Sequence, residues 1–249
     1  MLDTTIVTIR LKSFLFIILL VSNTIVAGEA LVISNGATKS PMHREHFDGF
    51  VDLVLLEALK RIDHKMDIRG LPNERSLMNA NRGLIDGEAQ RISGMENNYP
   101  NLIRVPEKIM DWQFVVFSKK NINTSEGWKS LMPYTTAFIT GWKIFEYNVP
   151  IKTSVMAVKN EEIMFTLLQR DRIDIVLYEL WQGLDFIKKH NYNDIKVSSP
   201  PIANREMFTY LHKKHARLVP KLAQALKDMK NDGTYNRIHD PVLGHLKNN

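Results

Sequence analysis

Two short segments of this sequence carry the side chains best suited to metal chemistry. His43-Arg-Glu-His46 and His212-Lys-Lys-His215 each place two histidines three residues apart. Histidine is a common zinc ligand, but a tetrahedral site needs four ligands, and neither pair has the cysteine or carboxylate companions that such a site uses. The sequence therefore predicts neither a metal nor another cofactor.

The motifs of nucleophilic and phosphate chemistry are also missing. No Gly-x-Ser-x-Gly segment presents a serine nucleophile, and no glycine-rich phosphate loop follows a strand. A dehydratase-like or lyase-like enzyme with Glu88 or Glu179 as general base stays open as an alternative. Because neither glutamate has a second, clearly paired titratable group, we predict a binding protein and not an enzyme.

The N-terminus has the order of an export signal. Arg10 and Lys12 precede the apolar run 13–21, and small residues around Ala27 and Ala30 follow. The run is too short to span a bilayer comfortably, although residues 23–27 would lengthen it in an uncleaved anchor. We expect residues 1–30 to be a signal peptide, cleaved after Ala27 or Ala30.

Charge and cysteine content narrow the class of protein further. The chain has a net charge of +6, but its lysines are spread out, without an arginine-rich tract or an interleaved aromatic stripe, so we do not predict binding to nucleic acid. The sequence contains no cysteine, so an exported form depends on its hydrophobic core and not on disulfides.

The rest of the chain alternates β-rich runs with amphipathic stretches, which predicts an α/β fold with mostly parallel sheets flanked by helices. A polar stretch at 118–127 separates two such regions. The predicted strands are 31–33, 65–71, 86–92, 102–105, 112–117, 135–139, 173–177, 195–197 and 207–212, and the predicted helices are 48–62, 73–83, one from 142, 160–168 and 218–229.

Four segments resemble a known family in their order and spacing. They are Gly49-Phe-Val-Asp52, Gly83-Leu-Ile-Asp86, Arg172-Ile-Asp174, and the C-terminal stretch from Leu218-Val-Pro-Lys-Leu to Lys230-Asn-Asp-Gly-Thr-Tyr235. Together they resemble the type II periplasmic solute-binding proteins of amino-acid ABC transporters, bacterial solute-binding family 3. The resemblance covers essentially the whole chain after the signal.

The resemblance implies a two-lobed periplasmic-binding-protein-like fold with two hinge crossovers. Residues 31–118 plus 205–249 would form lobe 1, and residues 119–204 would form lobe 2. Such folds close on a ligand by a hinge motion, so the ligand-binding residues are expected in the cleft between the lobes.

In lobe 1, two arginines are candidates for ligand binding. The position expected to hold the arginine for a ligand carboxylate is near Asn98, so that arginine is missing. Arg91, at a strand end, can instead present its guanidinium to an anion, or can form a structural salt bridge with Asp86 or Glu88. Arg75, in the first turn of a helix, either faces the cleft or is solvated.

In lobe 2, the resemblance points to two strand ends. Gly141 corresponds to the family's glycine at a strand-to-helix turn, but Trp142 replaces the family's hydroxyl residue. The Trp142 indole either forms one side of the ligand site or packs on the helix behind it. Glu179, after Tyr178, falls where the family holds a ligand ammonium, although a strand-end acid can also cap the following helix.

The resemblance thus implies a receptor that captures an amino acid, or a small carboxylate or amine, for an ABC-type transporter. Its expected partner is an inner-membrane permease or receptor, and its expected oligomeric state is a monomer. A sensory protein that signals to a membrane receptor is the alternative. Because no cysteine follows the signal for lipidation, the resemblance predicts release into the periplasm.

Overall fold

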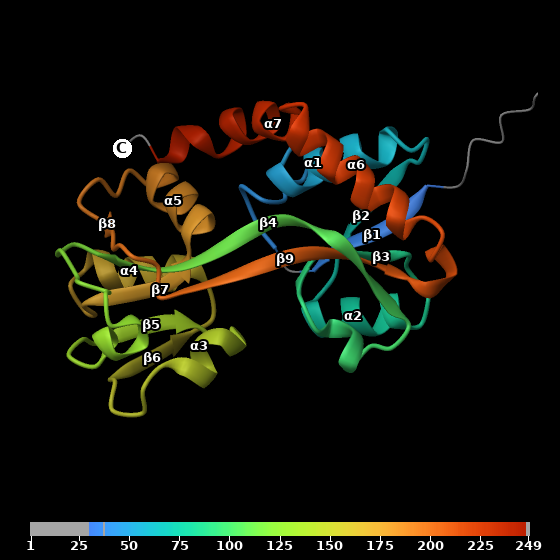
Figure 1. Cartoon of the computed structure of the whole chain (residues 1–249). Helices are drawn as coiled ribbons and strands as arrows, with labels where there is room; N and C mark the ends of the chain where they lie inside the picture. Colours follow the sequence, from blue (N-terminus) through green and yellow to red (C-terminus); the bar gives the residue numbers. More distant parts are fainter. Residues whose placement is uncertain (1–29, 37, 248–249) are drawn as a thin grey trace, which may run out of the picture.

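The computed structural model of this protein describes residues 30–36 and 38–247. Its strands form one nine-stranded sheet in the order β2-β1-β3-β9-β4-β7-β5-β6, with β8 paired to β4 (Figure 1). The strands are β1 (Leu31–Gly36), β2 (Met66–Gly70), β3 (Gly87–Ile92), β4 (Leu102–Ser118), β5 (Thr136–Ile139), β6 (Val155–Val158), β7 (Ile175–Glu179), β8 (Lys196–Val197) and β9 (Ala203–His212).

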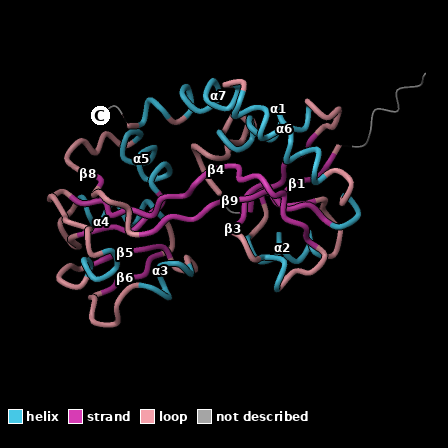
Figure 2. The backbone as a smooth tube through the Cα atoms, in the orientation of Figure 1, coloured by secondary structure: helices cyan, strands magenta, loops and turns pink. Residues whose placement is uncertain are grey.

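Helices cover both regions of the sheet, as the tube view in Figure 2 shows. The predicted export signal lies outside the described residues, except for Ala30 at its end. None of the helices in the described part of the chain combines the length and apolarity needed to cross a bilayer. The helices are α1 (Phe50–Lys60), α2 (Asn73–Asn81), α3 (Lys143–Asn148), α4 (Glu161–Gln169), α5 (Leu180–Lys189), α6 (Val219–Asn231) and α7 (Thr234–Val242).

The sheet consists of two parallel regions joined by two antiparallel strands. β1 pairs in parallel with β2 and β3, and β5 pairs in parallel with β6 and β7. β4 and β9 run antiparallel from one region to the other, from the pair Leu102 and His212 to the pair Phe114 and Ala203. Figure 1 shows these two strands side by side between two lobes, which confirms the expected two-lobed α/β fold.

β4 differs from the expectation of two strands at 102–105 and 112–117. It is a single irregular strand whose pairing with β9 shifts between Arg104 and Lys108 and again between Lys108 and Met110. Pro106 has no N–H to donate to a ladder, and the charged residues after it hide the strand pattern. The bounds proposed for the two lobes stay a prediction.

Lobe 1 is held together by a core between α1 and α6. Phe50, Leu55 and Leu59 of α1 are fully buried, as are Leu226 and Met229 of α6. Apolar side chains recur at three- and four-residue spacing on both helices, so each buries one continuous face against the sheet. The result is a rigid support for the ends of β1 and β3.

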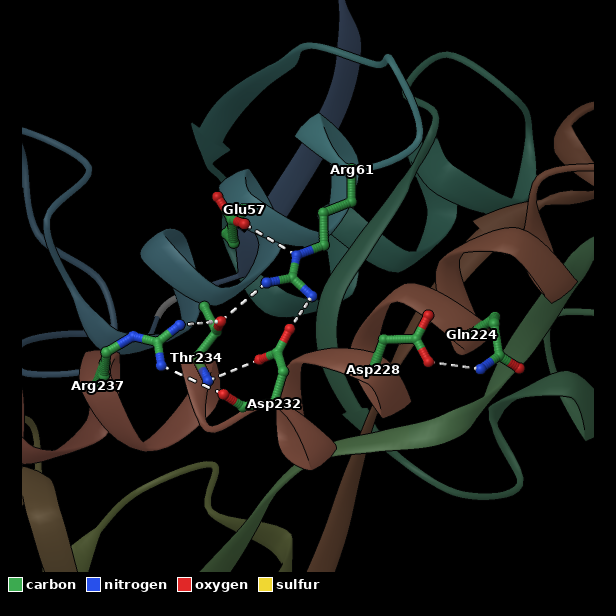
Figure 3. Close-up of polar contacts among 7 residues, drawn as sticks. All are labelled: Glu57, Arg61, Gln224, Asp228, Asp232, Thr234 and Arg237. Carbon is green, nitrogen blue, oxygen red and sulfur yellow. Dashed lines mark hydrogen bonds and ion pairs between the residues drawn. The ribbon is translucent and has the colours of Figure 1, made fainter.

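A polar network fixes α1 to the turn between α6 and α7 (Figure 3). Arg61 donates to Glu57 at 2.9 Å, to Asp232 at 2.7 Å and to the Thr234 hydroxyl at 2.8 Å. Hydrogen bonds from Thr234 and Arg61 lower the pKa of Asp232 well below its ordinary value. Gly233 has a φ of 77°, a left-handed conformation that suits glycine at a helix end. The turn therefore aims α7 in a defined direction.

That direction carries the C-terminal segment from lobe 1 to lobe 2, across the top of Figure 1. The His239 ring contacts both Phe50 of α1 and Trp181 of α5, at 5.7 and 5.6 Å between ring centres. Farther on, Lys188 of α5 donates to the His245 carbonyl at 3.0 Å, and Lys247 lies over the Trp181 ring. α7 thus touches a helix of each lobe.

Candidate functional site

The loop that follows β1 brings the two lobes into direct contact. Lys39 forms an ion pair with Glu161, the first residue of α4. The hydroxyl of Ser40 accepts a hydrogen bond from Lys189 of α5 at 2.9 Å, and Lys189 also pairs with Asp185 at 2.6 Å. The carboxyl end of β1 therefore lies against the helices of lobe 2, and the surfaces near this junction form the candidate site.

Arg91, near the end of β3, is held by acidic and polar neighbours. Its Nε and Nη2 atoms lie 2.8 and 2.7 Å from Glu88 Oε2, and Nη1 donates to Asn73 Oδ1 at 3.0 Å. Glu88 is fully buried and accepts a further hydrogen bond from Ser76, and burial raises its pKa against the opposing effect of Arg91. Arg91 thus makes the salt bridge that the sequence offered as its structural role.

Gly36 lies at the end of β1, directly beside this guanidinium. Its φ of 62° is in the left-handed region, and a Cβ added to it would come within 2.6 Å of Arg91 Nη2. Only glycine therefore lets the chain after β1 pass so close to Arg91.

Arg75 lies on the exposed side of the first turn of α2. No hydrogen bond or ion pair to it is present among the described residues, and its neighbour Glu74 instead accepts from the Tyr99 hydroxyl at 2.9 Å. The structure does not bring Arg75 into contact with Arg91. A role in ligand binding stays a prediction for both arginines.

A chain of aromatic contacts links the end of β3 to lobe 2. The Trp112 indole of β4 donates to the Gln90 side chain at 3.2 Å. Trp112 stacks on Trp142, whose ring also stacks on Phe145 of α3 and lies 5.0 Å from the Tyr178 ring. Trp142 is thus packed on the helix behind it and also stacked on β4, a strand that joins the two lobes. Trp112 was not predicted as a site residue, because the sequence of residues 112–117 indicates only a strand.

Gly141 and Tyr178 border this aromatic cluster. Gly141 has a φ of 90°, and its N–H donates to Glu146 Oε1 at 2.7 Å. Tyr178 is buried at the end of β7, and burial raises its pKa well above the ordinary value. The turn after β5 and the end of β7 therefore lie next to one another.

Glu179 is the last residue of β7 and is fully buried. Its Oε2 atom accepts a hydrogen bond from the Gln182 N–H at 3.0 Å, so it caps α5, as the sequence alternative proposed. Burial raises the pKa of its carboxyl to about 7, although the hydrogen bonds of the helix end act in the opposite direction. Capping uses only one of its two oxygens.

Apart from Arg91 Nη2, which forms an ion pair with Glu88, three buried polar atoms in β1, β3 and β7 have no hydrogen-bond partner in the part of the chain that the structure describes. They are Asn35 Oδ1 in β1, Gln90 Nε2 in β3 and Glu179 Oε1 in β7. An unpaired buried polar atom is costly, and in open α/β sheets ligands bind at the carboxyl ends of the strands. Two acceptors and one donor therefore remain without a partner in the described part of the chain. Asn35 was missed from the sequence, since a single asparagine has no spacing pattern to reveal it.

The two histidine pairs are used in other ways. His43 Nδ1 pairs with Asp52 at 2.5 Å, and His215 Nε2 pairs with Asp86 at 2.7 Å. His212 accepts a hydrogen bond from the Lys214 N–H at 3.2 Å. Among residues 30–36 and 38–247, no three histidine or carboxylate side chains gather as metal ligands.

Two open cavities lie away from these residues. One, of about 660 Å³, lies on lobe 1 between α1, the start of β2 and α7, and the other, of about 700 Å³, lies beside α5, β8 and residues 246–247. Neither contains the unpartnered buried atoms, so the junction of the strand ends is the better candidate site.

Known proteins resemble this chain more closely in fold than in sequence. No family model matches the sequence. An uncharacterised protein of Shewanella oneidensis is 28% identical over 209 residues, which cover 80% of this chain and 77% of that protein.

Solved structures share the fold at low sequence identity. A histidine kinase sensor domain similar to periplasmic binding proteins aligns with a TM-score of 0.71 and 13% identity, over 88% of this chain and 97% of that domain. An ancestral arginine-binding protein bound to arginine aligns with a TM-score of 0.67 and 18% identity, over 86% of this chain and 98% of that protein. The L-cystine solute receptor of Neisseria gonorrhoeae in its unliganded open conformation aligns with a TM-score of 0.66 and 18% identity, over 86% of this chain and 92% of that receptor. The chain therefore has the fold of the type II periplasmic solute-binding proteins, as the sequence resemblance implied.

Proposed function

We propose that this protein is an exported receptor that holds a small polar or charged ligand, an amino acid or a small carboxylate or amine, between its two lobes. The observation that carries the proposal is the set of three buried, unpartnered polar atoms on Asn35, Gln90 and Glu179, at the ends of strands from both lobes. A ligand that satisfies them gains hydrogen bonds that the protein alone lacks.

The side chains at the junction suit the two ends of such a ligand. Glu179 Oε1 accepts from a ligand ammonium, and the guanidinium of Arg91 remains partly accessible beside Glu88 for an anionic group. Trp112 and Trp142 form an aromatic wall, with Gly141 and Tyr178 at its border. Arg75 contributes from the exposed rim.

Delivery to an inner-membrane ABC-type transporter from the periplasm is the role that fits this site and the N-terminal export signal. Structures of similar fold include the substrate-binding protein of an amino acid ABC transporter, besides the arginine-binding protein and the cystine receptor. The likeness to a kinase sensor domain favours a second candidate, a receptor that signals to a membrane protein. Both need closure of the lobes on a ligand, and an adjacent permease gene or an adjacent kinase gene would separate them.

The experiment is a thermal-shift screen of residues 31–249 against amino acids, amines and small carboxylates, followed by calorimetry on the best ligand. Arg91→Ala and Glu179→Gln should each weaken binding by about 2 kcal/mol, because each removes a charged partner from a buried contact. The exposed Arg217, which precedes α6, provides the control Arg217→Ala with unchanged affinity. Unchanged affinity in both site variants would contradict the site. A ligand recovered as a different compound would instead indicate an enzyme.

A further inference from the structure

Lobe 2 carries a group of exposed apolar side chains on and beside its edge strand. Tyr147 is 78% exposed, Ile151 is fully exposed, and Val155, Met156 and Ile163 are 41–43% exposed. They come from α3, the loop before β6, β6 itself and α4. Exposed apolar residues gathered in one region mark an interaction surface, whereas single ones scattered over a protein do not.

β6 is at the centre of this surface and forms an edge of the sheet. It is the last strand in the sheet order, and of the described strands it pairs only with β5. Adjacent residues of a strand point to opposite faces, so the exposure of both Val155 and Met156 leaves β6 uncovered on both faces. Proteins usually protect an edge with charges, proline or a bulge, and Val155-Met-Ala-Val158 has no charge or proline.

We propose that β6 pairs antiparallel with β6 of a second copy of this chain, around a twofold axis near Met156 and Ala157. A twofold interface uses the same surface on both copies, and an edge strand is complementary to itself in this arrangement. The nine-stranded sheet then continues into the second copy, and the exposed apolar side chains beside β6 are covered.

The charges beside the strand fit this pairing. In an antiparallel pair, the residues before one strand lie next to the residues after the other. Lys152 precedes β6 and Glu162 follows it, so each lysine approaches a glutamate of the other copy. Neither side chain has an ion pair among the described residues, so both are free to make this contact. A lipid surface suits the edge less well, because hydrocarbon cannot satisfy the free backbone N–H and C=O groups of the strand.

Sedimentation equilibrium over a range of concentrations tests the association of residues 31–249. The native chain should form a dimer, and Val155→Lys should weaken it at least tenfold, because the lysine places a charge in the apolar interface. Leu84, 68% exposed in lobe 1, supplies the control Leu84→Lys with unchanged association. A monomer at every concentration, or a dimer that Val155→Lys leaves unchanged, overturns the proposal.

Cross-linking provides a test that does not depend on affinity, because the sequence contains no cysteine. Residues opposite each other in an antiparallel pair have Cα atoms about 4.5–5.5 Å apart, which a disulfide can bridge. If the axis passes through residue 156 or 157, Met156→Cys or Ala157→Cys alone should oxidise to a linked dimer. If the axis passes between them, an equal mixture of the two variants should do so.

Leu84→Cys is the control for random collision. The proposal is overturned if the yield of disulfide-linked dimer does not exceed that of Leu84→Cys in either variant or in their mixture. Cosedimentation of the monomeric native chain with vesicles containing phosphatidylglycerol, lost in Val155→Lys, would also overturn it and assign the edge to a membrane surface.

Discussion

At the scale of single residues, Glu179 combines two tasks that oppose each other. Its cap of α5 favours the ionised carboxylate, while complete burial disfavours it, and burial dominates because the pKa rises to about 7. A raised folded-state pKa means that the unfolded chain ionises first as pH rises. The contribution of this residue to stability is therefore complete below about pH 4.5 and is lost as pH rises through 7.

Replacing the carboxyl with an amide should remove this dependence. Gln at position 179 can still accept the hydrogen bond from Gln182 and cannot ionise. Relative to Glu179→Gln, the native chain should lose free energy of unfolding between pH 5 and pH 8, on the order of 3 kcal/mol for a shift of this size. Urea unfolding of both proteins at pH 5 and pH 8 measures this loss of free energy of unfolding. The exposed Glu126 gives the control Glu126→Gln, and an equal change with pH in the native chain and Glu179→Gln would refute the burial argument.

The sequence predicted part of the candidate site at this scale. It selected Arg91 and Glu179 and also named the salt bridge and the helix cap that the structure contains. It did not select Asn35 or Trp112, because their importance depends on a missing hydrogen-bond partner and on a stacked ring from the turn after β5. Both are three-dimensional properties that no local spacing encodes.

At the scale of elements, the packing of α5 on β4 depends on one glycine. Gly183 of α5 is buried, and a Cβ there would overlap the Phe117 ring. Alanine ordinarily stabilises a helix by about 1 kcal/mol relative to glycine. Overpacking a core costs about 1–3 kcal/mol, and the overlap is with a fully buried ring that cannot move aside freely.

Gly183→Ala should therefore destabilise the protein by about 1–3 kcal/mol, in contrast to the helix propensity. Thermal unfolding measures the change. The matched control is the same substitution in a Phe117→Leu background, where the smaller side chain leaves room for the methyl group. There the substitution should be neutral or stabilising, and an equal loss in both backgrounds would show that the ring is not the cause.

The elements themselves were mostly predictable. Strong periodic segments such as α1, α6 and β9 follow from their apolar spacing. β6 and α7 were not expected. β6 has only four residues and is uncovered on both faces, so it lacks the alternation of a half-buried strand. α7 begins directly after Gly233 and contains Pro241, and these two residues are typical of helix ends.

At the scale of the whole molecule, the ion pair between Lys39 and Glu161 joins loop and helix across the lobes. The proposed opening of the lobes must break this ion pair, so the pair favours the closed arrangement. A partly exposed pair contributes up to about 1 kcal/mol, which corresponds to about fivefold in the ratio of closed to open forms.

Lys39→Ala should thus increase the radius of gyration of the ligand-free chain in small-angle scattering and weaken ligand binding up to about fivefold. Both effects should shrink in high salt, which screens exposed charges. Lys120 pairs with Asp174 within lobe 2 and gives the control Lys120→Ala. If the native chain and Lys39→Ala give the same scattering curve at low salt, the ion pair between Lys39 and Glu161 does not hold the lobes closed.

The path of α7 has a consequence for how the lobes can move. Two neighbouring strands alone act like a flexible ribbon, which allows both bending and twisting. Besides the contacts of Lys39 and Ser40, the contacts of α7 and the following residues with Trp181 and Lys188 attach the lobes at a point off that ribbon. Twisting would shear this outer attachment along its length, while bending towards the side of α3 and α2 only stretches or lifts its end. The C-terminal segment therefore opposes a twist of one lobe against the other more strongly than it opposes bending.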